Sequence, residues 1–241
     1  VIHVNFKLTQ MKQEYIILSS SIDTSVVDSI WIDKPTQRNH SKGRSVDGAT
    51  NWKIFENPSP NASNNFSVGY DAYTLPPLFD ISPGFYTSSV TLNLSSTQPG
   101  VTIRYTTDGS EPSSGSTLFT SPLTINNTKI IRAKCFSTNA NYYPSFTENN
   151  TYFINENHTF PVLSVASDDF NNLFGGAPEI MSSFEFYDES KQFQFEMEGD
   201  FRGHGNDSWA FNQKGIRFYT RDQYGYANKI DHKIFPTSPR T

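Results

Sequence analysis

Apolar and polar residues alternate in the middle of the chain, and this period of two constrains the fold more than any other feature. Val90, Leu92 and Leu94 alternate with polar residues, and the same pattern returns over residues 101–106 and 131–135. A period of two sends one set of side chains into a core and the other into water, as in a half-buried β-strand. Asp108 and Gly109 follow one such strand directly and tolerate a positive φ, so a tight turn is expected there. Several short strands at this spacing predict a β-sandwich.

Strand-like segments also lie on both sides of this region. They cover residues 4–8, 14–18, 26–32 and 52–55 before it, and residues 161–165, 183–187, 193–197 and 214–219 after it. Aromatic residues make up 15% of the chain, and aromatic side chains suit a pleated, half-buried surface. Residues 167–174, which Gly175 and Gly176 follow, predict one short helix. The chain is therefore predicted to be mainly β.

Charge and cysteine content narrow the classes of function. The 241 residues carry a net charge of −5 without a basic block, which argues against a nucleic-acid partner. No run of about 18 apolar residues occurs, so no membrane-spanning segment is predicted. The single cysteine, Cys135, excludes an intrachain disulfide, and its alternating setting favours a small buried hydrophobe over a reactive thiol. The histidines lack metal-ligand spacing, so no metal site is predicted.

Composition divides the chain into three segments: residues 1–68, 69–155 and 156–241. The stretch 57–65 is rich in Pro, Asn and Ser, cannot easily build a core, and is interpreted as a linker. The chain begins with Val1 in a strand-like segment, so we expect a fragment or a processed product. A chain of this length accommodates one to three domains.

The first segment carries a set of spaced motifs. They are residues 40–44 (His-Ser-Lys-Gly-Arg), the Asp47-Gly48 turn, Trp52, and residues 58–61 (Pro-Ser-Pro-Asn) followed by Asn64. This set resembles the end of a bacterial lamin-tail domain. The resemblance implies an immunoglobulin-like sandwich over residues 1–68 whose first strands are missing or reduced. For Trp52, packing at a sandwich edge is favoured over a ligand platform.

The second segment holds the most specific motif of the chain, Tyr-Thr-Thr-Asp-Gly-Ser-Glu-Pro over residues 105–112. With Ser-Pro-Gly-Phe-Tyr over residues 82–86, it resembles the carboxy-terminal domain of chitobiase-type proteins. This resemblance implies a fibronectin-III-like module over residues 69–155 with an accessory or spacing role. A Ca²⁺ site at Asp108 and Glu111 is a weaker alternative, because two carboxylates are too few for the 6–8 oxygens that Ca²⁺ prefers.

The third segment contains Phe-Arg-Gly-His-Gly-Asn-Asp-Ser over residues 201–208, followed by Lys214. In such an arrangement a glycine turn lets backbone N–H groups approach a phosphate, and a lysine adds a charge. The alternative is an ordinary β-turn with a solvated lysine. The motif resembles the start of the CotH (spore coat protein H) kinase-like family, which implies a partial α+β segment over residues 156–241. The resemblance implies nucleotide phosphate contacts for Gly203, Gly205, Asn206, Ser208 and Lys214.

Acidic residues are scarce after this motif. Only Asp222 and Asp231 follow Lys214, and Asp222 belongs to a turn motif. Phosphoryl transfer needs carboxylates that hold Mg²⁺ and a group that orients the nucleophile. No catalytic residue and no cofactor are therefore predicted for this chain, and the resemblance implies ATP and Mg²⁺ only for a longer protein. Whether the whole protein is an enzyme stays open.

The leading hypothesis is a non-catalytic structural or interaction segment of a modular bacterial protein. We expect it to be secreted or exposed on the cell surface, outside the outer membrane, with other proteins or surface glycans as partners, including those of a cell-envelope complex. Two alternatives stay open. One is an atypical CotH-like kinase whose catalytic half is missing from this chain. The other is carbohydrate binding by the sandwich modules, where aromatic pairs such as Phe85-Tyr86 and Tyr142-Tyr143 stack on sugars or belong to the core.

Overall fold

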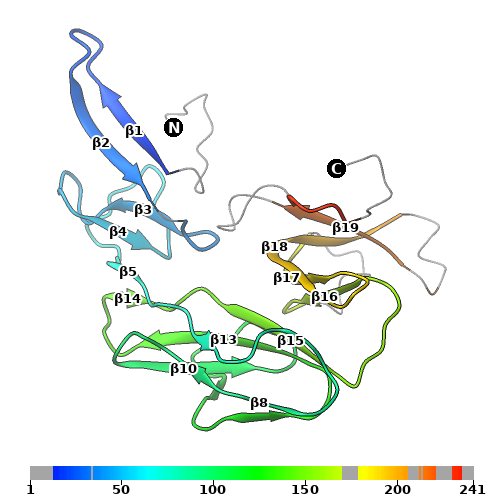
Figure 1. Ribbon diagram of the computed structural model, residues 1–241. Coiled ribbons are helices and arrows are strands. Elements are labelled where there is room, and N and C mark those ends of the chain that lie inside the picture. The colour runs from blue at the N-terminus through cyan, green and yellow to red at the C-terminus, as the bar shows by residue number, and fades with distance from the viewer. Residues whose placement is uncertain are drawn as a thin grey trace. The chain divides into compact units, whose positions relative to one another are not determined.

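The computed structural model describes residues 13–33, 35–169, 179–205, 212, 214–220 and 230–234 (Figure 1). All regular elements in these ranges are strands, which confirms a mainly β chain. The predicted strand at residues 4–8 lies outside the described residues, as does most of the predicted helix. Of its described residues, Asp168 and Asp169 lie in a turn. The predicted α+β character of the third segment is thus not shown.

The described residues fall into two compact units. Unit 1 contains the described residues up to Asp71 together with Thr220, and unit 2 runs from Ala72 to Tyr219 and includes residues 230–234. The second and third predicted segments therefore share unit 2. A domain boundary between residues 155 and 156 stays a prediction.

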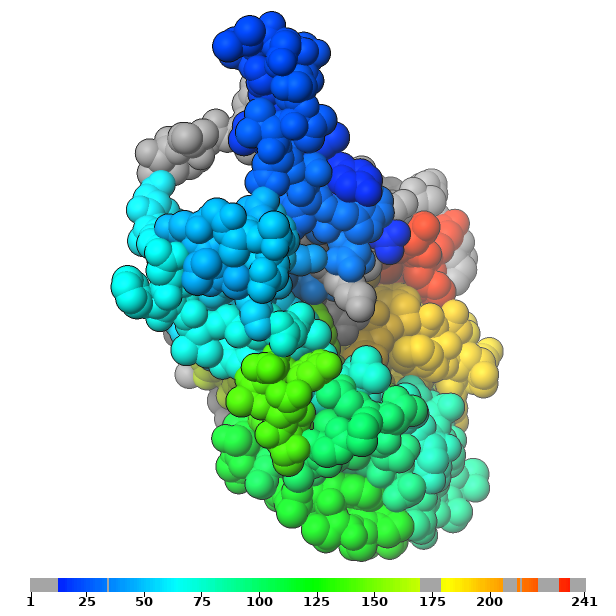
Figure 2. Space-filling model, turned by 90° about the vertical axis from the view of Figure 1, so that its left-hand side faces the viewer, coloured from blue at the N-terminus to red at the C-terminus, as the bar shows by residue number. Residues whose placement is uncertain are grey.

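Unit 1 is built from two small antiparallel sheets. One is the hairpin of β1 (Glu14–Ser19) and β2 (Val26–Ile32), and the other pairs β3 (Ser41–Arg44) with β4 (Trp52–Phe55). In Figure 2 the hairpin, coloured blue, extends beyond the cyan remainder of this unit. A two-stranded hairpin leaves both faces open, and Tyr15 and Ile17 of β1 are accordingly exposed.

The predicted linker at residues 57–65 is folded back onto the β3–β4 pair. The side-chain amide of Asn64 donates to the Arg44 carbonyl (3.0 Å), and the Asn64 N–H donates to the Asp47 carboxylate (3.2 Å). Asn65 in turn accepts from the Asp47 N–H (2.8 Å). The stretch interpreted as a linker is therefore held against the β3–β4 pair by these hydrogen bonds, although most of its residues are exposed.

Unit 2 contains a β-sandwich. Its larger sheet has five strands, in spatial order β11 (Thr117–Leu118), β10 (Val101–Thr106), β13 (Lys129–Ser137), β15 (Glu148–Ile154) and β7 (Gly84–Tyr86). Three strand pairs complete it: β8 (Val90–Leu92) with β12 (Leu123–Ile125), β6 (Leu78–Phe79) with β9 (Leu94–Ser95), and β5 (Ala72–Tyr73) with β14 (Tyr142–Tyr143). The alternating residues meet between these layers, as the period of two predicts. The buried core consists of Leu92, Leu94, Ile103, Ile125, Ile131, Ala133, Cys135, Tyr152 and Ile154.

A four-stranded sheet follows within the same unit. It is ordered β16 (Val162–Ala166), β17 (Ile180–Tyr187), β18 (Phe193–His204) and β19 (Gly215–Thr220). Its two faces differ sharply. Phe184 and Phe186 contact Phe195 on one face, with ring centroids 5.8 and 5.5 Å apart, whereas Glu185 pairs directly with Glu196 on the other.

Candidate functional site

The acidic face of the four-stranded sheet packs on the outer face of the sandwich. The two faces of β13 set this up, because Ile131, Ala133 and Cys135 point into the sandwich core while Arg132 and Lys134 point away from it. We call the side chains between these two sheets the interlayer. It comprises Glu111, Arg132, Lys134, Thr147, Asn149, Thr151, Phe153, Ser164, Glu185, Tyr187, Glu196 and Glu198.

Glu111 anchors one end of the interlayer. Its carboxylate accepts hydrogen bonds from Arg132 (2.6 Å), Lys134 (3.0 Å) and the Thr147 hydroxyl. Desolvation acts to raise the pKa of Glu111, but the charges of Arg132 and Lys134 and the Thr147 hydroxyl outweigh it, so the pKa lies below its usual range. Arg132 also donates to the Gly109 carbonyl (3.0 Å), which ties the Asp108-Gly109 turn to β13.

The same turn reaches the four-stranded sheet. The Glu111 N–H donates to the Asp168 carboxylate, and a Cβ placed on Gly109 would lie 3.7 Å from Cα of Ala166 at the end of β16. Gly109 adopts a φ of +86°, which a glycine adopts without steric cost. The most specific motif of the sequence therefore contains the sandwich turn that contacts the end of β16 in the four-stranded sheet.

This geometry also bears on the Ca²⁺ alternative. Asp108 accepts from the Ser110 N–H (3.1 Å) and hydroxyl (2.6 Å), and Glu111 is occupied by two cations. The Asp108 carboxylate therefore stabilises the turn and the Glu111 carboxylate binds the interlayer cations, so the two do not converge on one ion. Among the described residues, no group of three or more His, Cys, Asp or Glu side chains could hold a metal.

Thr151 forms the polar centre of the interlayer. Its N–H donates to Glu185 (3.2 Å), and its hydroxyl lies 2.7 Å from the Ser164 hydroxyl of β16. The Tyr187 hydroxyl lies 3.5 Å from the Thr151 carbonyl. One residue of β15 thus contacts both β16 and β17.

Aromatic rings close the other end. Phe85 and Phe153 stack with centroids 4.3 Å apart, and Tyr187 meets both edge-on at 5.6 and 5.2 Å. Tyr187 is completely buried, and burial raises the pKa of its hydroxyl. Such ring pairs add roughly 0.5–1.5 kcal/mol beyond the area that they bury.

Carboxylates outnumber cations in this layer. Burial raises the pKa of Glu185 to about 7 and that of Glu198 to about 7, while burial and the charge of Glu185 raise the pKa of Glu196 to about 9. Three buried polar atoms of the interlayer have no hydrogen-bond partner among the described residues: Glu185 Oε2, Asn149 Oδ1 and Arg132 Nε. The interlayer is therefore a charged, incompletely satisfied contact, unlike the apolar core.

The predicted nucleotide residues are only partly described. Gly203 lies inside β18, so it is not part of a glycine turn, and this part of the prediction was wrong. Gly205 directly follows the strand with a φ of +97°, and Lys214 is exposed just before β19. Asn206 and Ser208 lie outside the described residues. Phosphate contact by any of these residues stays a prediction.

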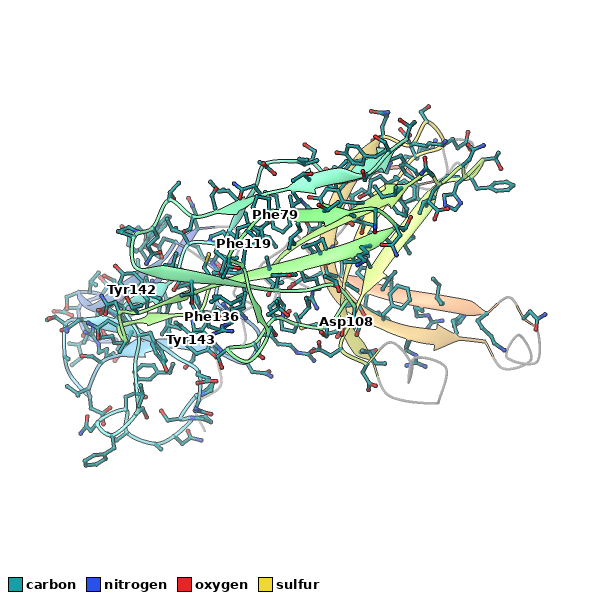
Figure 3. The ribbon with its side chains drawn as sticks, turned by 90° about the horizontal axis from the view of Figure 1, so that it is seen from below. Phe79, Asp108, Phe119, Phe136, Tyr142 and Tyr143 are labelled. Carbon is teal, nitrogen blue, oxygen red and sulfur yellow. The ribbon has the colours of Figure 1, made fainter. Side chains whose placement is uncertain are left out.

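Other predicted side chains have clear places. Cys135 is completely buried, which confirms the interpretation as a small buried residue, and burial raises the pKa of its thiol to about 11. Tyr142 and Tyr143 lie together, well away from Asp108 (Figure 3). Tyr143 meets Tyr73 edge-on at 6.1 Å, so its ring takes part in packing.

A hollow of about 520 Å³ lies beside the interlayer. Its lining combines Phe85 and Tyr86 of β7 with polar side chains of neighbouring loops, Thr87, Asn155, Glu156, Asn157, Ser190, Lys191 and Gln192. The Lys191 ammonium group is held by the Asn157 side chain (2.8 Å) and lies 5.7 Å from the centre of the Phe85 ring. The hollow could take a small polar ligand.

The sequence reasoning missed the interlayer. Its signal is visible in hindsight, because residues 183–187 (Ser-Phe-Glu-Phe-Tyr) and 193–198 (Phe-Gln-Phe-Glu-Met-Glu) place apolar residues on one face and three glutamates on the other. Two neighbouring strands of this kind form a sheet with an aromatic face and an acidic face. A local pattern, however, could not identify which residues of the sandwich pack against this acidic face.

Unit 2 is thus of the β-sandwich class, with a second sheet attached through a polar layer. The family model of the chitobiase/beta-hexosaminidase C-terminal domain matches residues 81–147, which confirms the resemblance of the second segment. The match is compatible with a non-catalytic, modular segment. The comparisons give no support to the lamin-tail and CotH resemblances. No curated protein and no solved structure matched the chain. No helix in the described part of the chain could cross a membrane.

Proposed function

We propose that the chain is a non-catalytic structural and interaction segment of a modular bacterial protein, secreted or displayed outside the outer membrane. The chitobiase-type module acts in it as a spacer that holds the four-stranded sheet in a fixed orientation. Its partners are other proteins or surface glycans, including components of a cell-envelope complex.

The interlayer is the observation that supports this proposal. A flexible joint would expose the facing side chains to water, whereas Glu185 and Tyr187 are completely buried and Thr151 is 1% exposed. Contacts come from the Glu111 loop, from β15 and from the Phe85 ring, so they spread along the whole layer. A spacer needs such a distributed contact, because a single contact would allow rotation.

Hydrogen exchange of the whole chain tests the spacer role. Ile125 lies in β12, in the sandwich layer that does not face the four-stranded sheet. If the sandwich supports the sheet, Ile125→Ala lowers the exchange protection of β13 and of β17 together, because both belong to one cooperative unit. Protection of β17 that stays at the wild-type level while β13 loses protection would contradict the spacer role.

A second candidate function is glycan binding at the hollow beside Phe85. The observation that favours it is the combination of a half-buried tyrosine, Tyr86, with the amide side chains of Asn155, Asn157 and Gln192. Amides and aromatic rings are groups that fix the orientation of polar ligands in largely apolar sites. A glycan array tests this candidate, with Gln192→Ala to remove an amide and Thr102→Ala, outside the hollow, as the control. Equal signals from both variants would remove it.

A further inference from the structure

Two glutamates oppose each other directly inside the interlayer. Glu185 of β17 and Glu196 of β18 are cross-strand partners, and Glu198 lies two residues further along the same face, opposite Ser183. Like charges placed directly opposite each other destabilise a strand pair. The effect grows as water is excluded, because the local dielectric constant falls.

The cations of the layer are engaged elsewhere. Arg132 and Lys134 both contact Glu111, at 2.6 and 3.0 Å. Glu185 instead accepts from the Thr151 N–H, and its Oε2 has no partner. The titratable and charged groups that face the pair, from all packed elements, are Glu111, Arg132, Lys134, Tyr187, Glu198 and Asp200, while Glu148 and Tyr152 lie on the opposite face of β15.

We propose that the interlayer is a proton-dependent joint: the four-stranded sheet stays packed on the sandwich while Glu185 and Glu196 hold protons, and it loosens when both ionise. A protonated carboxyl group can donate a hydrogen bond and carries no charge, so it removes the repulsion and the desolvation cost together. This inference rests on the same interlayer contacts as the proposed spacer role, and it makes the fixed orientation depend on the protonation of the two glutamates.

The direction of the pH effect follows from the shifts. The pKa values of Glu185, Glu196 and Glu198 are raised to about 7, 9 and 7 from an ordinary value of 4.5. Packing by these groups is therefore fully favourable below their ordinary pKa and is lost as the pH rises through about 7 to about 9. Glu111 has a lowered pKa, so its ion pairs weaken only in acid.

Thermal unfolding of the whole chain with a matched pair of variants provides the test. We expect the Tm of the wild type to fall by roughly 2–4 °C or more between about pH 6 and about pH 9. Glu196→Gln mimics the protonated side chain, so it should flatten this fall and raise the Tm at the alkaline end. Glu189→Gln, an equal change at an exposed position of the β17–β18 turn, should keep the wild-type slope. Equal slopes for the two variants would overturn the proposal.

Hydrogen exchange of the wild type gives a readout that needs no variant. The Thr151 N–H donates to Glu185 and reports on this contact directly. After correction for intrinsic exchange, its protection should fall about tenfold or more between about pH 6 and about pH 9, while the Ile103 N–H in the core stays protected. Constant Thr151 protection over this range would contradict the joint even if Glu196→Gln fails to fold.

Discussion

The sandwich core and the interlayer lie on opposite faces of the same strand, β13, and they are stabilised in different ways. On the inner face Ile131 and Cys135 are 1% and 0% exposed and belong to the apolar cluster of the core. On the outer face Arg132 is 5% exposed, yet it is held by a carboxylate and a backbone carbonyl. The two regions are buried to a similar degree, but the hydrophobic effect stabilises the core, whereas charge pairing stabilises the interlayer.

This difference implies different sensitivities. An apolar core has no group that titrates near neutral pH, so its contribution to stability is constant there. The interlayer contains glutamates whose pKa values are raised to about 7 and about 9, so its contribution changes with pH. The inner face of β13 can therefore keep the sandwich folded while the contact between its outer face and the four-stranded sheet changes with pH.

The largest expected effect comes from truncation of the core. Leu92 is completely buried, so Leu92→Ala should lower the free energy of unfolding by roughly 2–5 kcal/mol, through lost burial and a residual cavity. Denaturant unfolding at about pH 6 and about pH 8 should give the same loss. Leu118→Ala, at a position 42% exposed on β11, is the control and should change stability little. A loss of unfolding free energy for Leu92→Ala that depends strongly on pH would contradict the distinction between a pH-independent core and a pH-dependent interlayer.

Removal of Arg132, one of the two interlayer cations, should have the next largest effect. Arg132→Met keeps the length of the side chain but leaves Glu111 with only Lys134 and Thr147, and we expect a loss of roughly 1–3 kcal/mol in unfolding free energy. Lys42→Met removes a cation from a surface pair with Asp33 and should cost about 0–1 kcal/mol. Equal losses for both variants would show that the interlayer pair behaves like a surface pair.

A smaller effect is expected from a single hydroxyl group. Tyr187→Phe keeps the ring contacts with Phe85 and Phe153 but removes a polar group beside Glu185 and Thr151, which should cost about 1 kcal/mol by denaturant unfolding. Tyr15→Phe, on the exposed hairpin, should be silent. A silent Tyr187→Phe would mean that the rings alone close this end of the interlayer.

The smallest expected effect concerns nucleotide. Only Asp222 and Asp231 follow Lys214, which are too few carboxylates to hold Mg²⁺ with a nucleotide, so millimolar Mg-ATP should leave the Tm of the chain unchanged. Lys214→Ala should behave like the wild type in the same thermal shift assay. A ligand-induced rise in Tm that disappears in Lys214→Ala would instead favour the kinase-like alternative.

Much of the fold could be predicted because its signal is local. The alternation at residues 90–94, 101–106 and 131–135 determines which side chains enter the core, and β8, β10 and β13 follow it. The burial of Cys135 follows from the same pattern. Local rules also failed in places: Gly203 was predicted to lie in a turn, although hydrogen bonding in a sheet includes it in β18.

The interlayer could not be predicted in the same way, because its partners are far apart in the sequence. Glu111 meets Arg132 across 21 residues, and Thr151 meets Glu185 across 34. Alternation shows that Glu185 and Glu196 lie on the face opposite the aromatic face of their sheet, but an acidic face is normally exposed to water. Only the arrangement of the sheets shows that it meets Arg132 and Lys134.

The central claim is that the sandwich and the four-stranded sheet form one body joined by the interlayer. The most direct test is a distance distribution between spin labels at Ser114, on the sandwich, and Ser190, on the β17–β18 turn, both of which are exposed. Buried Cys135 should not react with the label. At about pH 5 we expect a single narrow distribution, because the glutamates are then protonated. A broad distribution at this pH, as two independently moving bodies would give, would contradict the account.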